Sequence, residues 1–166
     1  MNQQIYLEAD TLITSKTDTK GFITYANDDF IKYSGYKLKD LLFKNHNILR
    51  HPDMPKIAYK ALWEQIQGGK EFFAFVKNKT KENDFYWVFA NITPSFDMNK
   101  NIIGYYSVRR APNLEAVKLI ETIYTDLINI EKKEGMKGSA KALFDIVRSY
   151  KMSYNELIFR LQENSL

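Results

Sequence analysis

Cysteine is absent from the 166 residues of this chain. Without it the protein has no disulfides, thiolate metal sites or cysteine nucleophiles. Histidine is scarce as well, because only His46 and His51 are present, and their spacing is not that of a helical metal motif. We therefore expect neither a metal site nor thiol-based catalysis.

Long apolar runs are also missing. The longest, at residues 85–90, is far too short to cross a bilayer. The N-terminal residues lack the basic start and the long apolar stretch of a signal peptide. The sequence therefore predicts a soluble, cytoplasmic protein without direct membrane insertion.

Charge of one sign is not concentrated anywhere in the sequence. The formal net charge is +4, but lysines alternate with acids and never form a block. A nucleic-acid-binding protein would need a basic face, and this pattern does not favour one. With 45% hydrophobic and 14% aromatic residues, the chain is long and apolar enough for one domain with a core and a small appendage.

Alternating and helical patterns predict an α+β fold with a five-stranded antiparallel sheet. Asn27 or Asp28 can cap the first helix, which Gly35 ends, and Gly68 and Gly69 close the longest one. Strands are expected at 12–17, 22–26, 71–79, 85–93 and 102–110, and helical segments at 28–33, 38–43 and 55–67.

Beyond Pro112 the spacing of apolar residues becomes helical. Residues 135–139 are expected to separate the first two helices, and Ser153 with Glu156 forms a capping box for the last. These helices could fold on the chain's own sheet or present a free surface for a partner. We therefore divide the chain into a domain at 1–112 and a helical signalling region at 113–166.

The polar segment at residues 45–55 gathers Arg50, His51, Asp53 and several amides just before a helix that carries Trp63. A guanidinium can bind phosphate oxygens in a bidentate manner, imidazole and carboxylate can bond phosphates or sugar hydroxyls, and an indole can pack on a flat ring. FAD has all of these parts. The alternative is structural: Asp53 caps the helix, and Arg50 and His51 are surface residues.

Six segments together resemble a PAS domain. More narrowly, they resemble the FAD-binding PAS domains of aerotaxis receptors and CetB-like energy-taxis proteins. The Arg-His-Pro-Asp-Met-Pro string at 50–55 is the most specific of them. The short C-terminal part is similar to that of the energy-taxis proteins, since aerotaxis receptors continue into membrane and signalling segments. The resembling segments are residues 10–18, 21–30, 34–36, 50–55, 86–91 and 104–110.

This resemblance implies a redox or energy-state sensor, not an enzyme, that binds FAD without a covalent link and signals to a membrane-bound chemoreceptor-like partner. The sequence also leaves open whether the protein forms a homodimer. Phe72 stands where aerotaxis receptors carry a tryptophan, and an amide of Asn78 or Asn91 could respond to the protonation of the flavin edge. The implied FAD contacts are Arg50, His51 and Asp53, with Trp63, Asn78, Tyr86, Trp87 and Asn91 as further pocket residues.

Three other functions stay open. One is a PAS sensor for haem or another small ligand, with His51 or His46 as an axial ligand, although both lie in a polar loop. Another is a PAS interaction module without a ligand, in which the aromatic residues form a core. The third, a flavoenzyme, lacks an evident acid/base pair or second substrate site.

Overall fold

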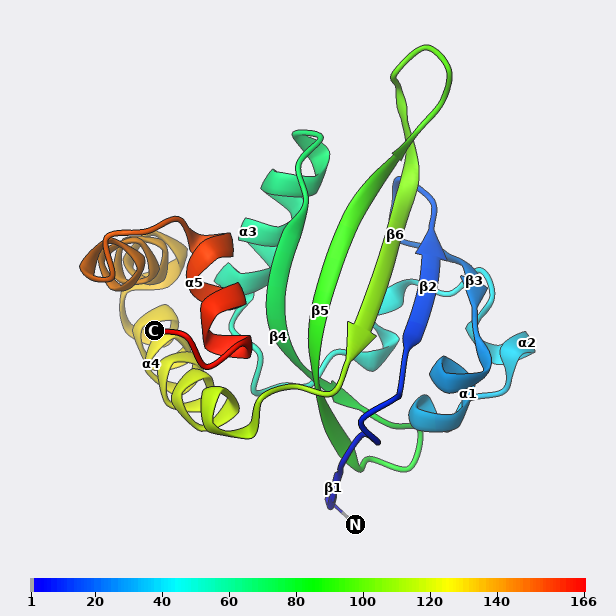
Figure 1. The fold of residues 1–166 in the computed structure, drawn as a ribbon, viewed down its shortest axis with the longest axis horizontal. Helices are drawn as coiled ribbons and strands as arrows, with labels where there is room; N and C mark the ends of the chain where they lie inside the picture. The colour runs from blue at the N-terminus through cyan, green and yellow to red at the C-terminus, as the bar shows by residue number, and fades with distance from the viewer. Residues whose placement is uncertain (1) are drawn as a thin grey trace.

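The computed structural model describes residues 2–166 as a curved sheet with short helices on one side and a C-terminal helical unit on the other (Figure 1). The strands are β1 (Gln4–Ile5), β2 (Ile13–Thr17), β3 (Ile23–Ala26), β4 (Phe72–Lys79), β5 (Phe85–Phe96) and β6 (Ile102–Arg110). The helices are α1 (Asp28–Ser34), α2 (Leu38–Leu41), the 3-10 helix η1 (His46–Leu49), α3 (Lys56–Gln67), α4 (Leu114–Ser149) and α5 (Tyr154–Gln162).

The predicted strands and helices are all present, with small differences at their ends. Strands β2, β3, β4, β5 and β6 pair antiparallel, as expected. β5 continues to Phe96, beyond the expected end at residue 93. The sequence did not indicate β1, a two-residue strand that pairs parallel with the start of β5.

The pairing register gives the sheet two chemically different faces. Side chains alternate along a strand, and directly opposed residues of paired strands share a face. Asn78 therefore shares a face with Tyr86, and Lys77 shares the other with Trp87. The face with Tyr86, Val88 and Ala90 packs against α1 and the segment around η1. We call it the cavity face, and the opposite one the outer face.

β2 and β6 approach each other closely at Gly104. A Cβ atom added there would lie 2.2 Å from the carbonyl oxygen of Thr17. Only glycine allows this approach without moving the backbone. The next residue, Tyr105, is thereby fixed on the cavity face opposite Thr17.

The C-terminal helices fold onto the chain's own sheet, which is the appendage arrangement. Trp87 and Phe89 of the outer face pack against Tyr124 and Leu127 of α4 and against Leu157 of α5. The hydroxyl of Tyr124 donates a hydrogen bond of 2.9 Å to the carbonyl oxygen of Phe75. Burial of these rings on both sides holds the helical unit against β4 and β5.

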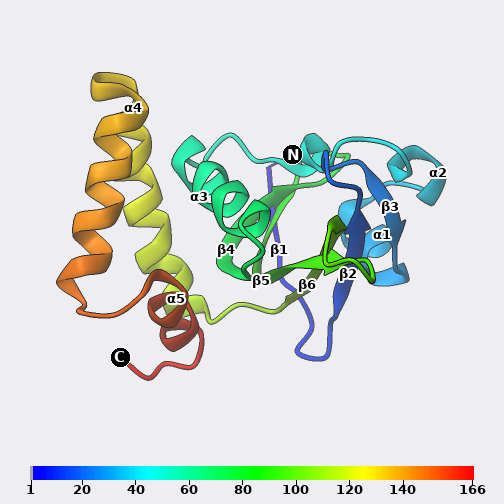
Figure 2. The same cartoon turned by 90° about the horizontal axis from the view of Figure 1, so that it is seen from above.

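Helix α4 is a hairpin of two helical arms joined at Gly135, whose φ of 72° is left-handed (Figure 2). The break is narrower than the predicted one at 135–139, because Ser139 is already helical and its hydroxyl bonds Glu131 and the carbonyl of Met136. The start of α5 is as predicted, since the side chain of Ser153 accepts a hydrogen bond from the N–H of Glu156.

Candidate functional site

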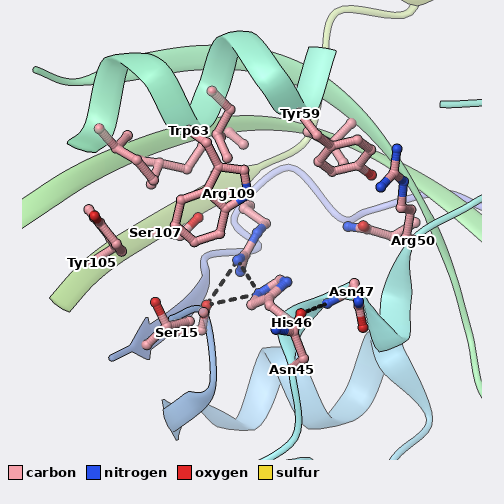
Figure 3. Close-up of a pocket in the computed structure, with 18 of the residues that line it drawn as sticks. Ser15, Asn45, His46, Asn47, Arg50, Tyr59, Trp63, Tyr105, Ser107 and Arg109 are labelled. Carbon is pink, nitrogen blue, oxygen red and sulfur yellow. Dashed lines mark hydrogen bonds between the residues drawn. The ribbon is translucent and has the colours of Figure 1, made fainter. Parts of the chain in front are cut away.

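A cavity of about 430 Å³ lies between α3 and the cavity face of the sheet (Figure 3). Its volume is in the range of pockets that hold small-molecule ligands. The lining residues come from β2, the following turn, the η1 segment, α3 and strands β4 to β6: Ser15, Thr17, Lys20, Gly21, Asn45, His46, Asn47, Arg50, Tyr59, Leu62, Trp63, Ile66, Val76, Asn78, Ala90, Ile92, Tyr105, Ser107 and Arg109.

One wall of the cavity is a stripe of α3. Tyr59, Leu62, Trp63 and Ile66 follow the spacing that places side chains on one helix face. The ring of Trp63 meets the ring of Tyr105 edge to face, with centroids 5.6 Å apart. Apolar strand residues lie on the other side, so this part of the cavity suits a flat aromatic ligand.

The guanidinium of Arg50 stacks on the ring of Tyr59, 3.8 Å from its centroid. Burial raises the pKa of Tyr59 to about 12, although the positive charge of Arg50 beside it acts in the opposite direction. The Tyr59 hydroxyl has no hydrogen-bond partner in residues 2–166. The hydroxyl is therefore a neutral donor at neutral pH. Arg50 and Tyr59 together offer hydrogen-bond donors to a phosphate or carbonyl oxygen.

Arg109 of β6 projects between Ser15 and His46 (Figure 3). One of its nitrogens, Nη2, donates to Ser15 Oγ at 2.9 Å and to His46 Nε2 at 2.7 Å. Because arginine has only donors, the imidazole must accept through an unprotonated Nε2. Burial, with the charge of Arg109 beside it, lowers the pKa of His46 to about 3, so this histidine is neutral.

The charges on the lining have one sign. Lys20, Arg50 and Arg109 are cationic, and none of the described residues that line the cavity is an aspartate or glutamate. Three lining groups are buried without a hydrogen-bond partner in residues 2–166: the Tyr59 hydroxyl, Ser107 Oγ and Arg109 Nη1. Buried polar groups are almost always satisfied, so these atoms indicate a polar, electron-rich ligand.

Three of the residues proposed from the sequence line this cavity: Arg50, Trp63 and Asn78. Arg50 and Asn78 also form an antiparallel backbone bridge, which ties the polar loop to β4. The chain therefore brings the guanidinium, the indole and one amide to the same cavity from three different elements.

The structure does not place His51 and Asp53 in the lining of this cavity, although the sequence predicted ligand contacts for both. The ring of His51 is buried beside Phe85, with centroids 5.7 Å apart, and its Nδ1 accepts the N–H of Asp53. Asp53 Oδ2 accepts a charged hydrogen bond of 2.7 Å from Lys77 Nζ. This bond lowers the pKa of Asp53, and burial lowers that of His51.

The alternative role of Asp53 as a helix cap is not observed either. Pro55 occupies the N-cap position of α3 and contributes no side-chain bond. Instead, the carboxylate of Glu131 on α4 accepts the free N–H groups of Lys56 at 3.1 Å and Ile57 at 2.8 Å. The loop at 50–55 is thus held from the outer side, by Lys77 and α4.

Strand alternation separates the remaining predicted residues. Trp87 and Asn91 lie on the outer face, where Trp87 stacks on Tyr124 at 6.2 Å and Asn91 bonds Glu71. Tyr86 is on the cavity face but beyond the lining, packed near Tyr33. Its hydroxyl is buried without a partner in the described chain, and burial raises its pKa.

Sequence reasoning missed most of the polar lining on the sheet side, above all Arg109, Ser107 and Ser15. Alternate residues of β6, namely Tyr105, Ser107 and Arg109, carry the available signal, because a polar series with period two marks one face of a strand. His46 was considered only as a haem ligand, but its Nε2 is already bonded to Arg109.

Metal clusters and membrane-spanning helices are both absent from residues 2–166. No group of histidine and acidic side chains there could hold a metal ion. In the same part of the chain, no helix has both the length and the apolar character needed to cross a membrane.

Comparison with known proteins adds family information to this geometry. A family model described as "PAS fold" matches residues 23–109. The aerotaxis receptor of Escherichia coli is 41% identical over 125 residues, which are 75% of this chain and 24% of that protein. The nitrogen fixation regulatory protein of Klebsiella pneumoniae is 27% identical over 63% of this chain and 21% of its own length. The chain therefore spans about a quarter or less of these relatives.

Solved structures agree at the level of fold. The dark structure of the blue-light photoreceptor Aureochrome1 LOV superposes with a TM-score of 0.60 at 23% identity, over 64% of this chain and 80% of that one. A Light-Oxygen-Voltage domain studied with a flavin analogue gives a TM-score of 0.58 at 21% identity, over 66% of this chain and 82% of that one.

Proposed function

The chain belongs to the PAS-fold family, and from this membership we propose that it is an FAD-binding redox or energy-state sensor in aerotaxis or energy taxis, not an enzyme. Its signal would pass to a membrane-bound chemoreceptor-like protein. Similarity to the aerotaxis receptor supports a role in aerotaxis signalling. The fold shared with a Light-Oxygen-Voltage domain studied with a flavin analogue supports a flavin as the ligand.

One observation carries the proposal: the cavity combines an aromatic wall with three cations and has no acid among its described lining residues. A flavin ring matches the slot formed by Trp63 and Tyr105, and its polar edge matches the unpartnered donors on the β6 side. The anionic diphosphate of FAD matches Arg50 and Lys20, which belong to the loop and turn segments of the lining.

Each residue would have a definite task. Arg50 binds phosphate, Trp63 and Tyr105 position the ring, and Asn78 offers an amide that can donate or accept. His51 and Asp53 act indirectly, by fixing the loop that carries Arg50. When bound, the flavin supplies reversible electron uptake. The chain has no cysteine that could attach to it covalently.

The proposed signal leaves through the helical region. Residues 1–112 would form the sensor, of which residue 1 lies outside the described part, and residues 113–166 would form the output unit. Lys77 is next to Asn78 on β4, and its Nζ donates a hydrogen bond of 3.2 Å to the carboxylate of Glu121 on α4. The strand that carries Asn78 therefore contacts α4 directly. A homodimer or the chemoreceptor-like partner would then bind the altered helices.

Absorption spectroscopy of the purified protein tests this proposal. We expect the visible bands of oxidised flavin, and heat denaturation should release a cofactor with the mass of FAD. Reconstitution of the apoprotein with FAD and FMN in parallel distinguishes the two flavins. A colourless protein that takes up neither would contradict the proposal and favour an interaction module, and a haem Soret band would favour the haem sensor.

A further inference from the structure

Arg109 is a cation in an unusual position. Its residue is 5% exposed, and it lies on the sheet side of the cavity rather than at the surface. The ion pairs formed within residues 2–166 involve other cations, namely lysines, Arg160 and His51. A buried charge without an acidic partner is unfavourable for the fold. The burial of this charge is therefore not explained by a contribution to folding stability, and a functional role has to be considered.

The neighbours of Arg109 orient it without neutralising it. Ser15 and His46 both accept hydrogen bonds from Nη2, and both are uncharged. The guanidinium also lies 5.5 Å from the centroid of the Phe30 ring. Burial lowers the pKa of Arg109 to about 10, so it stays protonated at neutral pH.

One donor group of Arg109 is left over. Nη1 is buried without a hydrogen-bond partner in the described chain, and Ser107 Oγ, two residues away on the same strand face, is in the same condition. Both residues line the cavity. The guanidinium of Arg109 is thus held in place by two uncharged acceptors and keeps one N–H group free. Such a preorganised donor can stabilise negative charge that develops on a bound ligand.

We propose that Arg109 is the counter-charge for the negative charge that the bound flavin ring acquires on reduction. This inference rests on the proposed function. An electron from a low-potential one-electron donor adds one negative charge to the ring unless a proton follows it, and the donor is oxidised by the same electron. Arg109 stabilises the ring that has taken the electron without the proton. It therefore raises the midpoint potential of the flavin.

The test compares four proteins: the wild type, Arg109→Gln, Arg109→Lys and the control Arg110→Gln. Glutamine keeps hydrogen bonding but removes the charge, and lysine keeps the charge. Arg110 is exposed and adjacent in sequence, so its replacement removes a charge of the same sign outside the cavity. Anaerobic titration with mediator dyes gives the midpoint potential of each protein, and thermal unfolding of each apoprotein gives its melting temperature.

We expect Arg109→Gln to reduce the preference for reduced over oxidised flavin by about tenfold or more, which is a fall of about 59 mV for a one-electron couple or about 30 mV for a two-electron couple. Arg109→Lys and Arg110→Gln should stay near the wild type. The melting temperature of the Arg109→Gln apoprotein should be unchanged or higher, because an unpaired buried charge has been removed.

The outcomes separate the two proposals. If the wild type binds flavin and Arg109→Gln keeps the same potential, the role of Arg109 is wrong while the proposed function stands. A lower melting temperature of the Arg109→Gln apoprotein, or its failure to fold, shows that the guanidinium is a structural anchor and also overturns the inference. A wild type that binds no flavin overturns both.

Discussion

Single residues of the loop at 50–55 divide between two sides of the molecule. Arg50 lies at the cavity and stacks on Tyr59, whereas Asp53 lies on the outer side with Lys77. The side chain of Lys77 is 6% exposed and that of Asp53 is 58% exposed. Loss of Asp53 therefore leaves its carboxylate site open to water, and Lys77 keeps its second partner, Glu121.

Replacement of Arg50 by alanine should weaken flavin binding by about tenfold or more, because a charged hydrogen bond to phosphate contributes on the order of 1.5–3 kcal/mol. The melting temperature of the apoprotein should change little, since Arg50 makes no ion pair in residues 2–166. Titration of apoprotein with FAD measures the affinity. Asp53→Ala is the comparison variant and should weaken binding less, because Asp53 lies outside the cavity lining and only helps to fix the loop; an equal loss of affinity in the two variants would contradict the direct phosphate contact assigned to Arg50.

His46 should make stability depend on pH. Its pKa is about 3 in the folded chain against 6.5 for a free histidine. Between these values the unfolded state binds one more proton than the native state, so the free energy of unfolding rises with pH and falls by up to about 1.4 kcal/mol per pH unit on acidification. Urea unfolding from about pH 7 to about pH 4 measures the slope.

The acidic residues add their own titration, so the useful quantity is the difference in unfolding free energy between the wild type and His46→Gln. This difference should become less favourable to the wild type as the pH falls, because glutamine does not titrate. A difference that stays constant across the range would mean that His46 has an ordinary pKa in the folded protein.

Among the elements, α3 is shared by the cavity and the helical unit. One stripe of α3 lines the cavity, while Ile57 and Ala58 at its start belong to the apolar cluster that packs α4 against the outer face of the sheet. Its first N–H groups are bonded by Glu131, which belongs to a helix distant in sequence. A movement of α3 at the cavity would therefore change a contact with α4.

Glu131→Ala should lower the free energy of unfolding by about 0.5–2 kcal/mol, the usual effect of losing a side chain that caps a helix N-terminus. The carboxylate also accepts a bond of 3.3 Å from Ser139. Glu131→Gln should cost less, because its amide oxygen still accepts one bond. Urea unfolding measures both. Glu134→Ala, an exposed glutamate on the same helix, is the control, and an equal effect there would rule out capping as the cause.

On the scale of the whole molecule, polar contacts join the sensor to the helices at separate points. Lys77 bonds Glu121, and the side chain of Asn155 on α5 bonds the N–H of Phe73 and the carbonyl of Glu71 at the edge of β4. Between them lies the apolar cluster around Trp87 and Tyr124. The packed sheet resists continuous deformation, whereas a docked helical hairpin can change its packing as a unit.

Reduction of the flavin should therefore change hydrogen exchange in residues 114–161 more than in the sheet. The ligand can act only through different affinities for two states of the protein. Exchange of oxidised and dithionite-reduced protein, followed by mass spectrometry, measures the effect. Glu121→Gln should reduce the difference, and Glu115→Gln, whose partner Lys118 is on the same helix, should not. Identical exchange in both redox states would show that the signal leaves by another surface.

The sequence by itself determined the positions of strands β2 to β6 and of the helices, and three residues of the cavity. These follow from local patterns: the periodicity of apolar residues, Asn27 and Ser153 as caps, and the polar loop before the α3 stripe. Adjacent residues of one strand point to opposite faces, so the pair Tyr86 and Trp87 could not have lined one cavity together. That conclusion was available from the sequence.

Only the tertiary structure decided which face each strand residue occupies and which charges are buried. The pairing of β4, β5 and β6 placed Trp87 and Asn91 under α4 and turned Ser107 and Arg109 towards Ser15 and His46. The contact of Asp53 with Lys77 likewise turned its carboxylate away from the cavity. Strand register and burial depend on contacts between residues far apart in the chain, and a local pattern of residues contains no information about those distances.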